Sequence, residues 1–259
     1  MTDREFEEII TRAGAPGLIP GIYNYCDRWC ERCPFTARCL LFLDLRDMRA
    51  PAPRAEPAAT PEAADAEDGQ VARESLEQAL GLVRRGAERL GVTLSMDSRD
   101  HRVLMARLDA HRARARADPL VELATRLLMT TLPIVRTLGP VVRARGDARA
   151  VDALEVLGRM THLLAGKTYR AVSSALRAAG EIPELAEDAN GTAKVARLAA
   201  AEARDAWRVL MEAGRAAADG VPAQMVRLLD ELDRRLAARF PAAMAFVRPG
   251  FDDRPNDLA

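Results

Sequence analysis

The sequence predicts an all-α protein, a multi-helix antiparallel bundle preceded by a small cysteine-rich module. Hydrophobic residues make up 49% of the 259 residues and aromatic residues only 4%. The apolar content is mostly Ala, Leu and Val, a composition that favours helices over sheets. Beyond residue 70 the apolar residues recur every three or four positions, the repeat of one helix face. No stretch of useful length alternates between apolar and polar residues, as a β-strand would.

The chain is expected to have three parts. Residues 1–50 form the cysteine-rich module, residues 51–69 a flexible linker and residues 70–250 the helical bundle. The linker segment contains four prolines, five acidic residues and no large hydrophobic side chain. It therefore buries too little apolar surface to offset the entropy cost of ordering.

Two short helices are expected in the first part. Residues 2–5 match a capping box, in which a Thr and a Glu three residues later satisfy free N–H groups at a helix start. Glycines and prolines in residues 14–21 end this helix. The apolar run of residues 40–45 predicts a second helix that leaves the cysteine segment.

Caps and apolar stripes predict the bundle helices. The first, residues 70–91, has one apolar face, and Asp97 or Ser98 is placed to cap the second. That face consists of Leu76, Leu80, Val83, Ala87 and Leu90. Asp118 and Pro119 form a cap and first-turn pair for the third.

The third bundle helix, which reaches about Val142, is apolar on several faces. We expect it to be the most buried element, with kinks near Pro133 and Pro140. The remaining helices are expected to begin near residues 147, 190 and 222. Short connections between them predict an antiparallel bundle.

Charge and hydropathy argue against nucleic acid and membrane as partners. Lys plus Arg and Asp plus Glu both total 38, so no net field draws the chain to nucleic acid, although a local basic face stays open. The longest apolar stretch, about Leu120 to Val142, contains charged residues and is a poor membrane span. The first residues lack a signal-peptide pattern, so we expect a soluble cytoplasmic protein.

All four cysteines, Cys26, Cys30, Cys33 and Cys39, lie in one segment with the spacing C-x3-C-x2-C-x5-C. In a reducing compartment such a group ligates metal more often than it forms disulfides. Compact single-loop runs are typical of [4Fe-4S] clusters, whereas zinc sites commonly use two separated pairs. The module is therefore expected to bind a [4Fe-4S] cluster, with zinc as the alternative and disulfides or free thiols as the third interpretation.

The segment from Cys30 to Cys39 resembles the [4Fe-4S] loops of two enzyme families. It has the C-x2-C-P-x4-C end found in endonuclease III-like DNA glycosylases and the C-x2-C-P-[FY]-x3-C terminus of iron-sulfur PD-(D/E)xK nucleases. The resemblance implies that Cys30, Cys33 and Cys39 are cluster ligands and that Cys26 is the fourth. The glycosylase L-P-G-x-G hairpin and the acidic residue two positions before a nuclease lysine are both absent, so the resemblance implies a cluster without an activity.

Four further residues are candidate ligand contacts. Lys167 and Lys194 are the only lysines among 38 basic residues. We hypothesise that their ammonium groups, with a helix start at residues 190–192, hold one anionic ligand or acidic partner. His162 and Tyr169 align on one polar face of their helix, which predicts a ligand pocket between helices, a solvent-facing stripe being the alternative.

The sequence thus predicts an iron-sulfur protein whose [4Fe-4S] cluster is structural or redox-sensing. The bundle would be a binding module for a protein partner or anionic small ligand. Full thiolate ligation leaves no open iron, so an enzyme is not favoured. A zinc-stabilised interaction module and an enzyme with a pocket in the bundle are the alternatives.

Overall fold

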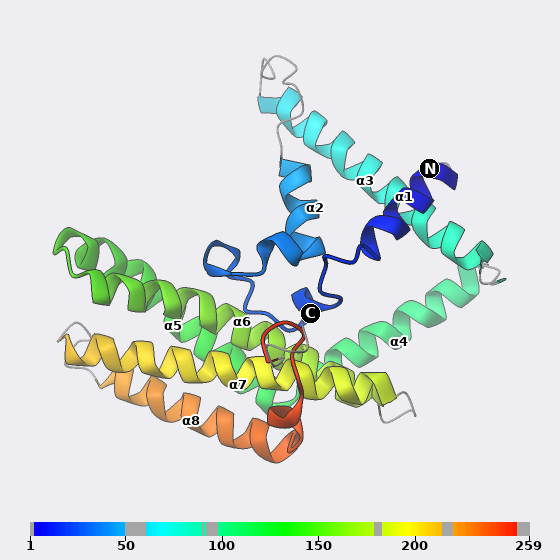
Figure 1. The fold of residues 1–259 in the computed structure, drawn as a ribbon. Coiled ribbons are helices and arrows are strands. Elements are labelled where there is room, and N and C mark those ends of the chain that lie inside the picture. The colour runs from blue at the N-terminus through cyan, green and yellow to red at the C-terminus, as the bar shows by residue number, and fades with distance from the viewer. Residues whose placement is uncertain are drawn as a thin grey trace. The chain divides into compact units, whose positions relative to one another are not determined.

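The computed structural model describes residues 3–49, 61–89, 91, 98–178, 183–213 and 220–252. Within these residues all regular structure is helical and no strand is present, so the all-α prediction is confirmed (Figure 1). The helices are α1 Asp3–Ala13, α2 Leu40–Arg49, α3 Pro61–Arg89, α4 Ser98–Arg116, α5 Pro119–Ala144, α6 Ala148–Ala178, α7 Pro183–Glu212 and α8 Val221–Arg239. Short 3-10 turns cover Ile22–Asn24, Cys30–Arg32, Thr36–Arg38 and Ala243–Ala245. None of the described helices is long and apolar enough to cross a membrane.

Contacts within the chain group the residues into two compact units. One unit comprises Met1–Tyr23 and Cys30–Val103, and so includes α1, α2 and α3. The other comprises Asn24–Trp29 and Leu104–Ala259, with α5 to α8. Six residues of the cysteine-rich segment therefore pack with the bundle, whereas the segment on either side of them belongs to the N-terminal unit.

The predicted flexible linker overlaps a helix. α3 begins at Pro61, so residues 61–69 are helical rather than linker. Proline suits the first turn of a helix because its missing N–H has no intrahelical partner there. Residues 51–60 of the predicted linker lie outside the described residues.

Two ion pairs tie α1 to its neighbours in the N-terminal unit. Arg12 on α1 pairs with Asp44 on α2 (Nη2 to Oδ1 3.1 Å), and Glu7 on α1 pairs with Arg89 on α3. The apolar face of α3 is not buried, since Leu76, Leu80 and Val83 are 60%, 45% and 58% exposed. The predicted apolar face is therefore exposed at these three positions.

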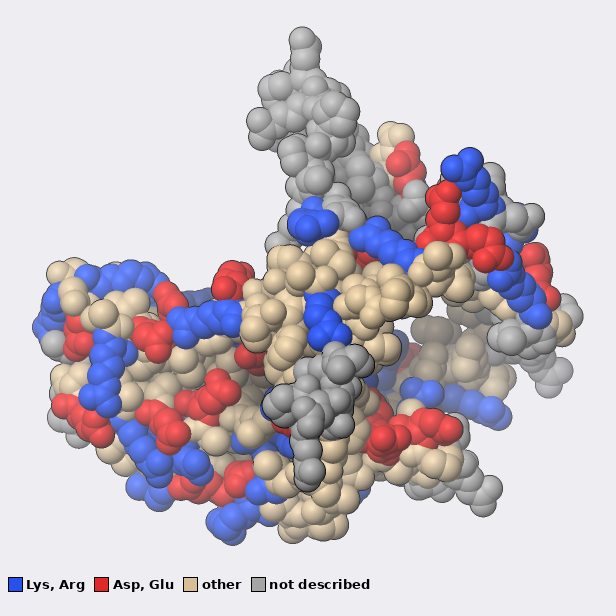
Figure 2. Space-filling view, in the orientation of Figure 1, with Lys and Arg blue, Asp and Glu red and all other residues tan. Residues whose placement is uncertain are grey.

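Helices α5 to α8 form the bundle, and successive helices run in opposite directions (Figure 1). Asp118 caps α5 as predicted, its Oδ1 accepting from the Leu120 N–H at 2.9 Å. Asp147 does the same for α6, accepting from the Ala150 N–H at 3.1 Å. Basic and acidic side chains are interspersed over the bundle face seen in Figure 2, as a net charge of zero suggests.

The centre of the bundle is formed by α6 and α7, not by α5 as predicted. Alanines line the inner side of α7 and allow close approach of its backbone to α6. The buried alanines of α7 are Ala189, Ala193, Ala196, Ala199, Ala200, Ala203 and Ala206. By contrast Met129 and Val141 on α5 are exposed, because that helix has more apolar faces than neighbours to cover them.

The predicted helix start at residues 190–192 is also wrong. α7 begins at Pro183, so these residues lie inside the helix and their backbone N–H groups serve the helix itself. α5 runs as one helix through Pro133 and Pro140, and the kinks expected there stay a prediction. The Thr137 hydroxyl, between the two prolines, donates to the Pro133 carbonyl at 2.9 Å.

Candidate functional site

Residues 24–29 are anchored to α7 by an aromatic pair. The Tyr25 and Phe246 rings pack with centroids 4.6 Å apart, over Gly191 in the interior of α7. A Cβ at Gly191 would lie 2.6 Å from Tyr25 Cε1 and 2.7 Å from Phe246 Cε1, closer than carbon atoms approach. Only glycine therefore lets these rings reach the helix, although glycine weakens a helix interior.

The Tyr25 hydroxyl ends in a polar cluster around Asp188. It donates to Asp188 Oδ1 at 3.2 Å, and the Ser174 hydroxyl donates to Asp188 Oδ2 at 2.8 Å. Arg170 of α6 pairs with the same carboxylate, with its Nε 3.2 Å from Oδ2. Burial and the Asp188 charge raise the pKa of Tyr25 to about 12, so the hydroxyl stays a donor at neutral pH.

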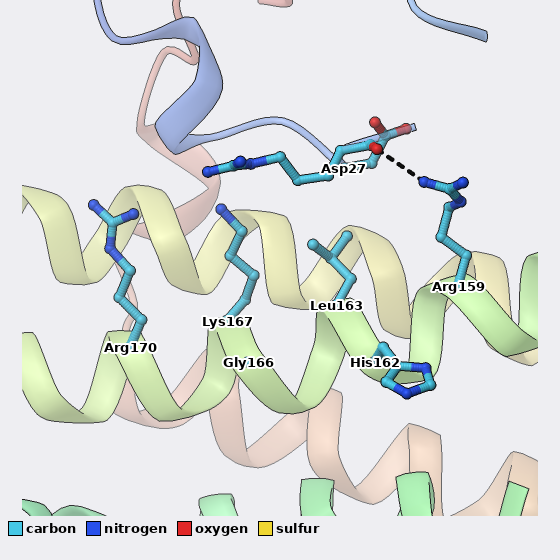
Figure 3. A pocket seen from close by; sticks show the side chains of 8 residues that line it. Asp27, Arg159, His162, Leu163, Gly166, Lys167 and Arg170 are labelled. Atoms are coloured by element: carbon cyan, nitrogen blue, oxygen red, sulfur yellow. Dashed lines mark hydrogen bonds between the residues drawn. The ribbon is translucent and has the colours of Figure 1, made fainter. Parts of the chain in front are cut away.

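Two basic side chains of α6 hold the backbone of the same segment. Lys167 Nζ donates to the Asn24 carbonyl at 2.5 Å, and Arg159 Nη1 donates to the Arg28 carbonyl at 2.8 Å. The Arg159 guanidinium also lies 4.9 Å above the ring of Trp29, which is buried. Both ends of the segment are thus fixed to one face of α6, and Figure 3 shows the bond made by Arg159.

Cys26 is buried within this anchored segment. Burial raises the pKa of its thiol, while a hydrogen bond from the Arg28 backbone N–H and the charges of Arg28 and Lys167 oppose that rise. Arg28 has a φ of 60°, a left-handed conformation uncommon for a residue with a side chain. The segment therefore turns sharply directly after Cys26.

The other three cysteines belong to the N-terminal unit and lie on consecutive tight turns. The Cys33 N–H donates to the Cys30 carbonyl at 3.2 Å, and the Cys39 N–H donates to the Thr36 carbonyl at 3.3 Å. The Phe35 N–H donates to Cys33 Sγ at 3.4 Å. The Cys33 sulfur thus accepts a hydrogen bond from a backbone N–H group, as the Cys26 sulfur does.

No disulfide joins any of the four cysteines, so the disulfide interpretation finds no pair here. Within the described residues no three His, Cys, Asp or Glu side chains are gathered as ligands for one metal ion. Cys26 lies in the bundle unit and the other cysteines in the N-terminal unit. The predicted metal centre therefore stays a prediction.

A cavity of about 580 Å³ opens beside the anchored segment, within the bundle unit (Figure 3). Asp27 and Arg28 form its wall on the segment side. From α6 come Arg159, His162, Leu163, Gly166, Lys167 and Arg170. In Figure 3 the Arg159, Lys167 and Arg170 side chains rise toward the segment, whereas His162 points away from it.

Lys167 is the most enclosed cation of the cavity, only 8% exposed. Burial, followed by the positive charges of Arg170 and Arg28, lowers the pKa of Lys167 to about 8, with Cys26 and Asp188 opposing that shift. At neutral pH the side chain remains mostly an ammonium group. The cavity therefore presents a buried positive charge surrounded by arginines.

The predicted ligand contacts separate into two groups. Lys167 and His162 line the cavity, with His162 Nδ1 lying 2.8 Å from the Gly158 carbonyl. Tyr169 packs against the core, and Lys194 does not line the cavity either. The polar-stripe prediction thus located one wall of a cavity but not its opposite wall.

Lys194 instead contacts two residues that follow the last helix, Phe246 and Asp252. Its ammonium group donates to the Phe246 carbonyl at 2.7 Å and pairs with Asp252 at 2.7 Å. Burial acts to raise the pKa of Asp252, but hydrogen bonds from Arg248 and Lys194 outweigh it and hold that pKa below its usual range. The charge of Lys194 is thus compensated by Asp252 and the expected helix start is absent, so these contacts lend no support to an anion site shared with Lys167.

Sequence reasoning missed Arg28, Arg170 and Gly191. Arg159, Leu163 and Arg170 recur at helical steps, so that spacing could have marked Arg170 as a neighbour of Lys167. No local signal marks Gly191, because its partners lie at positions 25 and 246. Comparison with known proteins supplies no guide, since no family model, curated protein or solved structure matches this chain.

Proposed function

We propose that the protein binds a [4Fe-4S] cluster through the thiolates of Cys26, Cys30, Cys33 and Cys39, and that the cluster is structural or redox-sensing. The observation that carries the proposal is the spacing C-x3-C-x2-C-x5-C, which places every cysteine of the chain within one short loop. Such single-loop runs supply cluster ligands. The bundle then acts as a module that binds a ligand or partner.

Hydrogen bonds to two of the sulfurs support the proposal. Backbone N–H groups of Arg28 and Phe35 donate to Cys26 and Cys33, respectively. Donors of this kind orient metal-bound thiolates and tune the potential of a cluster. Burial raises the pKa of the Cys26 thiol, and the charges of Arg28 and Lys167 oppose that rise, which favours the thiolate that binds metal.

The chemistry expected of this donor set is ligation and electron storage rather than substrate turnover. Four thiolates leave no iron position open. A reducing, cytoplasmic compartment keeps the thiols available for metal. The cluster would therefore stabilise the N-terminal loop, or report oxidation through its loss.

Metal analysis after oxygen-free purification tests the proposal. We expect a brown protein that absorbs near 400 nm and contains about four irons per chain. Cys33→Ser should lose most of the iron. Ala37→Ser is the matched control, because it adds the same hydroxyl to an exposed position between Cys33 and Cys39 and keeps all four thiols.

Two outcomes would contradict the cluster. A colourless protein with about one zinc per chain, lost in Cys33→Ser, would establish the zinc-stabilised module instead. Protein that contains no metal under any reconstitution, with Cys33→Ser unchanged in stability, would remove both metal-based proposals.

A further inference from the structure

The cavity beside residues 24–29 gathers positive charge that the iron-sulfur proposal does not use. Its lining contains four basic side chains, Arg28, Arg159, Lys167 and Arg170, and one carboxylate, Asp27. The whole chain carries no net charge, so this is a local accumulation. Like charges repel more strongly in a partly enclosed space than in water. An anionic ligand would relieve that repulsion.

Hydrogen bonds hold three of these side chains in preset positions. Lys167 and Arg159 donate to the carbonyl oxygens of Asn24 and Arg28, which carry no net charge. Asp188 pairs with Arg170. The Asp27 carboxylate accepts a hydrogen bond from the Trp29 N–H at 2.8 Å. The four basic side chains outnumber the carboxylates of Asp27 and Asp188 at the cavity.

We propose that this cavity binds a small molecule that bears a phosphoryl group. Guanidinium groups match phosphate oxygens through two parallel N–H donors, and an ammonium group adds a compact charge. The volume of about 580 Å³ falls within the range of small-molecule sites. Lys167 is only 8% exposed, so a phosphate of duplex nucleic acid, held on a bulky backbone, does not reach it.

Gly166 keeps the cavity open on the side of α6. It lines the cavity, and a Cβ built on it meets no atom within 4 Å. A leucine at this position fills the space while keeping every charge, and leucine is a better helix former than glycine. Gly166→Leu should therefore fill the cavity without unfolding the protein, so a loss of binding in this variant would reflect the lost cavity volume.

Arg28 offers a second clean variant. Its φ of 60° suits glycine, so Arg28→Gly removes the guanidinium group without backbone strain. Arg28→Lys keeps the positive charge and serves as the matched control. Gly166→Leu leaves every cysteine and the Arg28 and Lys167 side chains near Cys26 in place, so metal content measured on that variant distinguishes failure here from failure of the cluster proposal.

Binding is measured on the full-length, anaerobically purified protein labelled with ¹³C at lysine Cε. The chain has two lysines, so the spectrum has two lysine signals, and Lys194, held by Asp252, is the internal reference. Sodium phosphate is titrated at pH 7 against sodium chloride of equal ionic strength. We expect phosphate to shift the Lys167 signal saturably and to leave the Lys194 signal in place. Arg28→Gly should weaken binding about tenfold, as loss of a charged hydrogen bond implies, and Gly166→Leu should abolish it.

The proposal is overturned if chloride shifts the Lys167 signal as phosphate does, or if the signal does not move. It is also overturned if phosphate binds equally well to the wild type, Arg28→Gly and Gly166→Leu. Short duplex DNA that shifts the signal when phosphate does not would assign the cavity to a nucleic-acid partner instead.

Discussion

Helices α3 and α6 have similar lengths, 29 and 31 residues, and each carries a regular apolar stripe, but only α6 buries its stripe. On α6, Leu157 and Leu164 are fully buried, whereas Leu76 and Leu80 on α3 are exposed. The difference lies in the neighbouring surface. The alanine-lined face of α7 approaches α6 closely, while an ion pair from Arg89 links α3 to α1. A stripe thus predicts a helix and its apolar face, but burial depends on a complementary partner.

The largest effect is expected at the centre of α6. Leu164→Ala removes a fully buried side chain and leaves a cavity between α6 and its neighbours, so it should lower the free energy of unfolding by about 2–5 kcal/mol. Urea unfolding followed by tryptophan fluorescence measures this, because Trp29 and Trp207 both belong to the bundle unit. A loss below about 1 kcal/mol would mean that the core around α6 readily collapses into the space, and the contrast with α3 would weaken.

The same contrast explains how much of the molecule the sequence predicts. Stripes and the Asp118 cap are local signals, so the all-α class and several helix boundaries follow from them. How deeply a helix is buried depends on how many neighbouring helices cover it. α5 has more apolar faces than neighbouring helices to cover them, so part of its apolar surface is exposed. The hydrophobicity of α5 predicted that it would be the central helix. The small alanine side chains of α7 instead let that helix pack closely in the centre of the bundle.

The candidate site shows the same division between local and distant information. The four cysteines and Lys167 stand out by spacing and by rarity in the sequence. The contact of Lys167 with Asn24 joins residues 143 positions apart, and Lys194 meets Asp252 across 58. Contacts between residues so far apart produce no periodic pattern in the sequence. The wall formed by α6 could therefore be predicted, whereas the wall formed by Asp27 and Arg28 could not.

Gly191 gives the second largest expected effect. Gly191→Ala places a methyl group against Tyr25 and Phe246, so it should destabilise the bundle unit by about 1–3 kcal/mol despite the better helix propensity of alanine. Gly158→Ala on α6 is the control, since its Cβ would lie 3.7 Å from Val135 Cγ1, an ordinary contact. That variant should be neutral or more stable by up to about 1 kcal/mol. Urea unfolding followed by tryptophan fluorescence measures the stability of both variants. If both substitutions stabilised the protein equally, the Tyr25 and Phe246 rings would have to move aside at little cost.

A smaller effect, dependent on pH, is expected where Asp252 pairs with Lys194 of α7. The pKa of Asp252 is lower in the folded protein than in the unfolded chain, so the unfolded state binds more protons as the pH falls. The stabilisation is therefore complete above about pH 4 and declines as the pH drops further. Asp252→Asn should cost about 1–2 kcal/mol at pH 7, and its difference from wild type should narrow at pH 3. Asp205→Asn, at a carboxylate that is mostly exposed, is the control, and a difference for Asp252→Asn that stays constant with pH would contradict the assignment.

The smallest effect on stability is expected on α3. It comes from a leucine-to-alanine substitution, the same change that has the largest expected effect on α6. Leu80→Ala removes a side chain that is 45% exposed, so the free energy of unfolding should change by no more than about 0.5 kcal/mol. Circular dichroism at 222 nm during urea unfolding measures it, because the tryptophans do not report on the N-terminal unit. A cost as large as that of Leu164→Ala would mean that the α3 stripe is covered in solution. The two helices would then differ in which surface covers them, not in whether their stripes are buried.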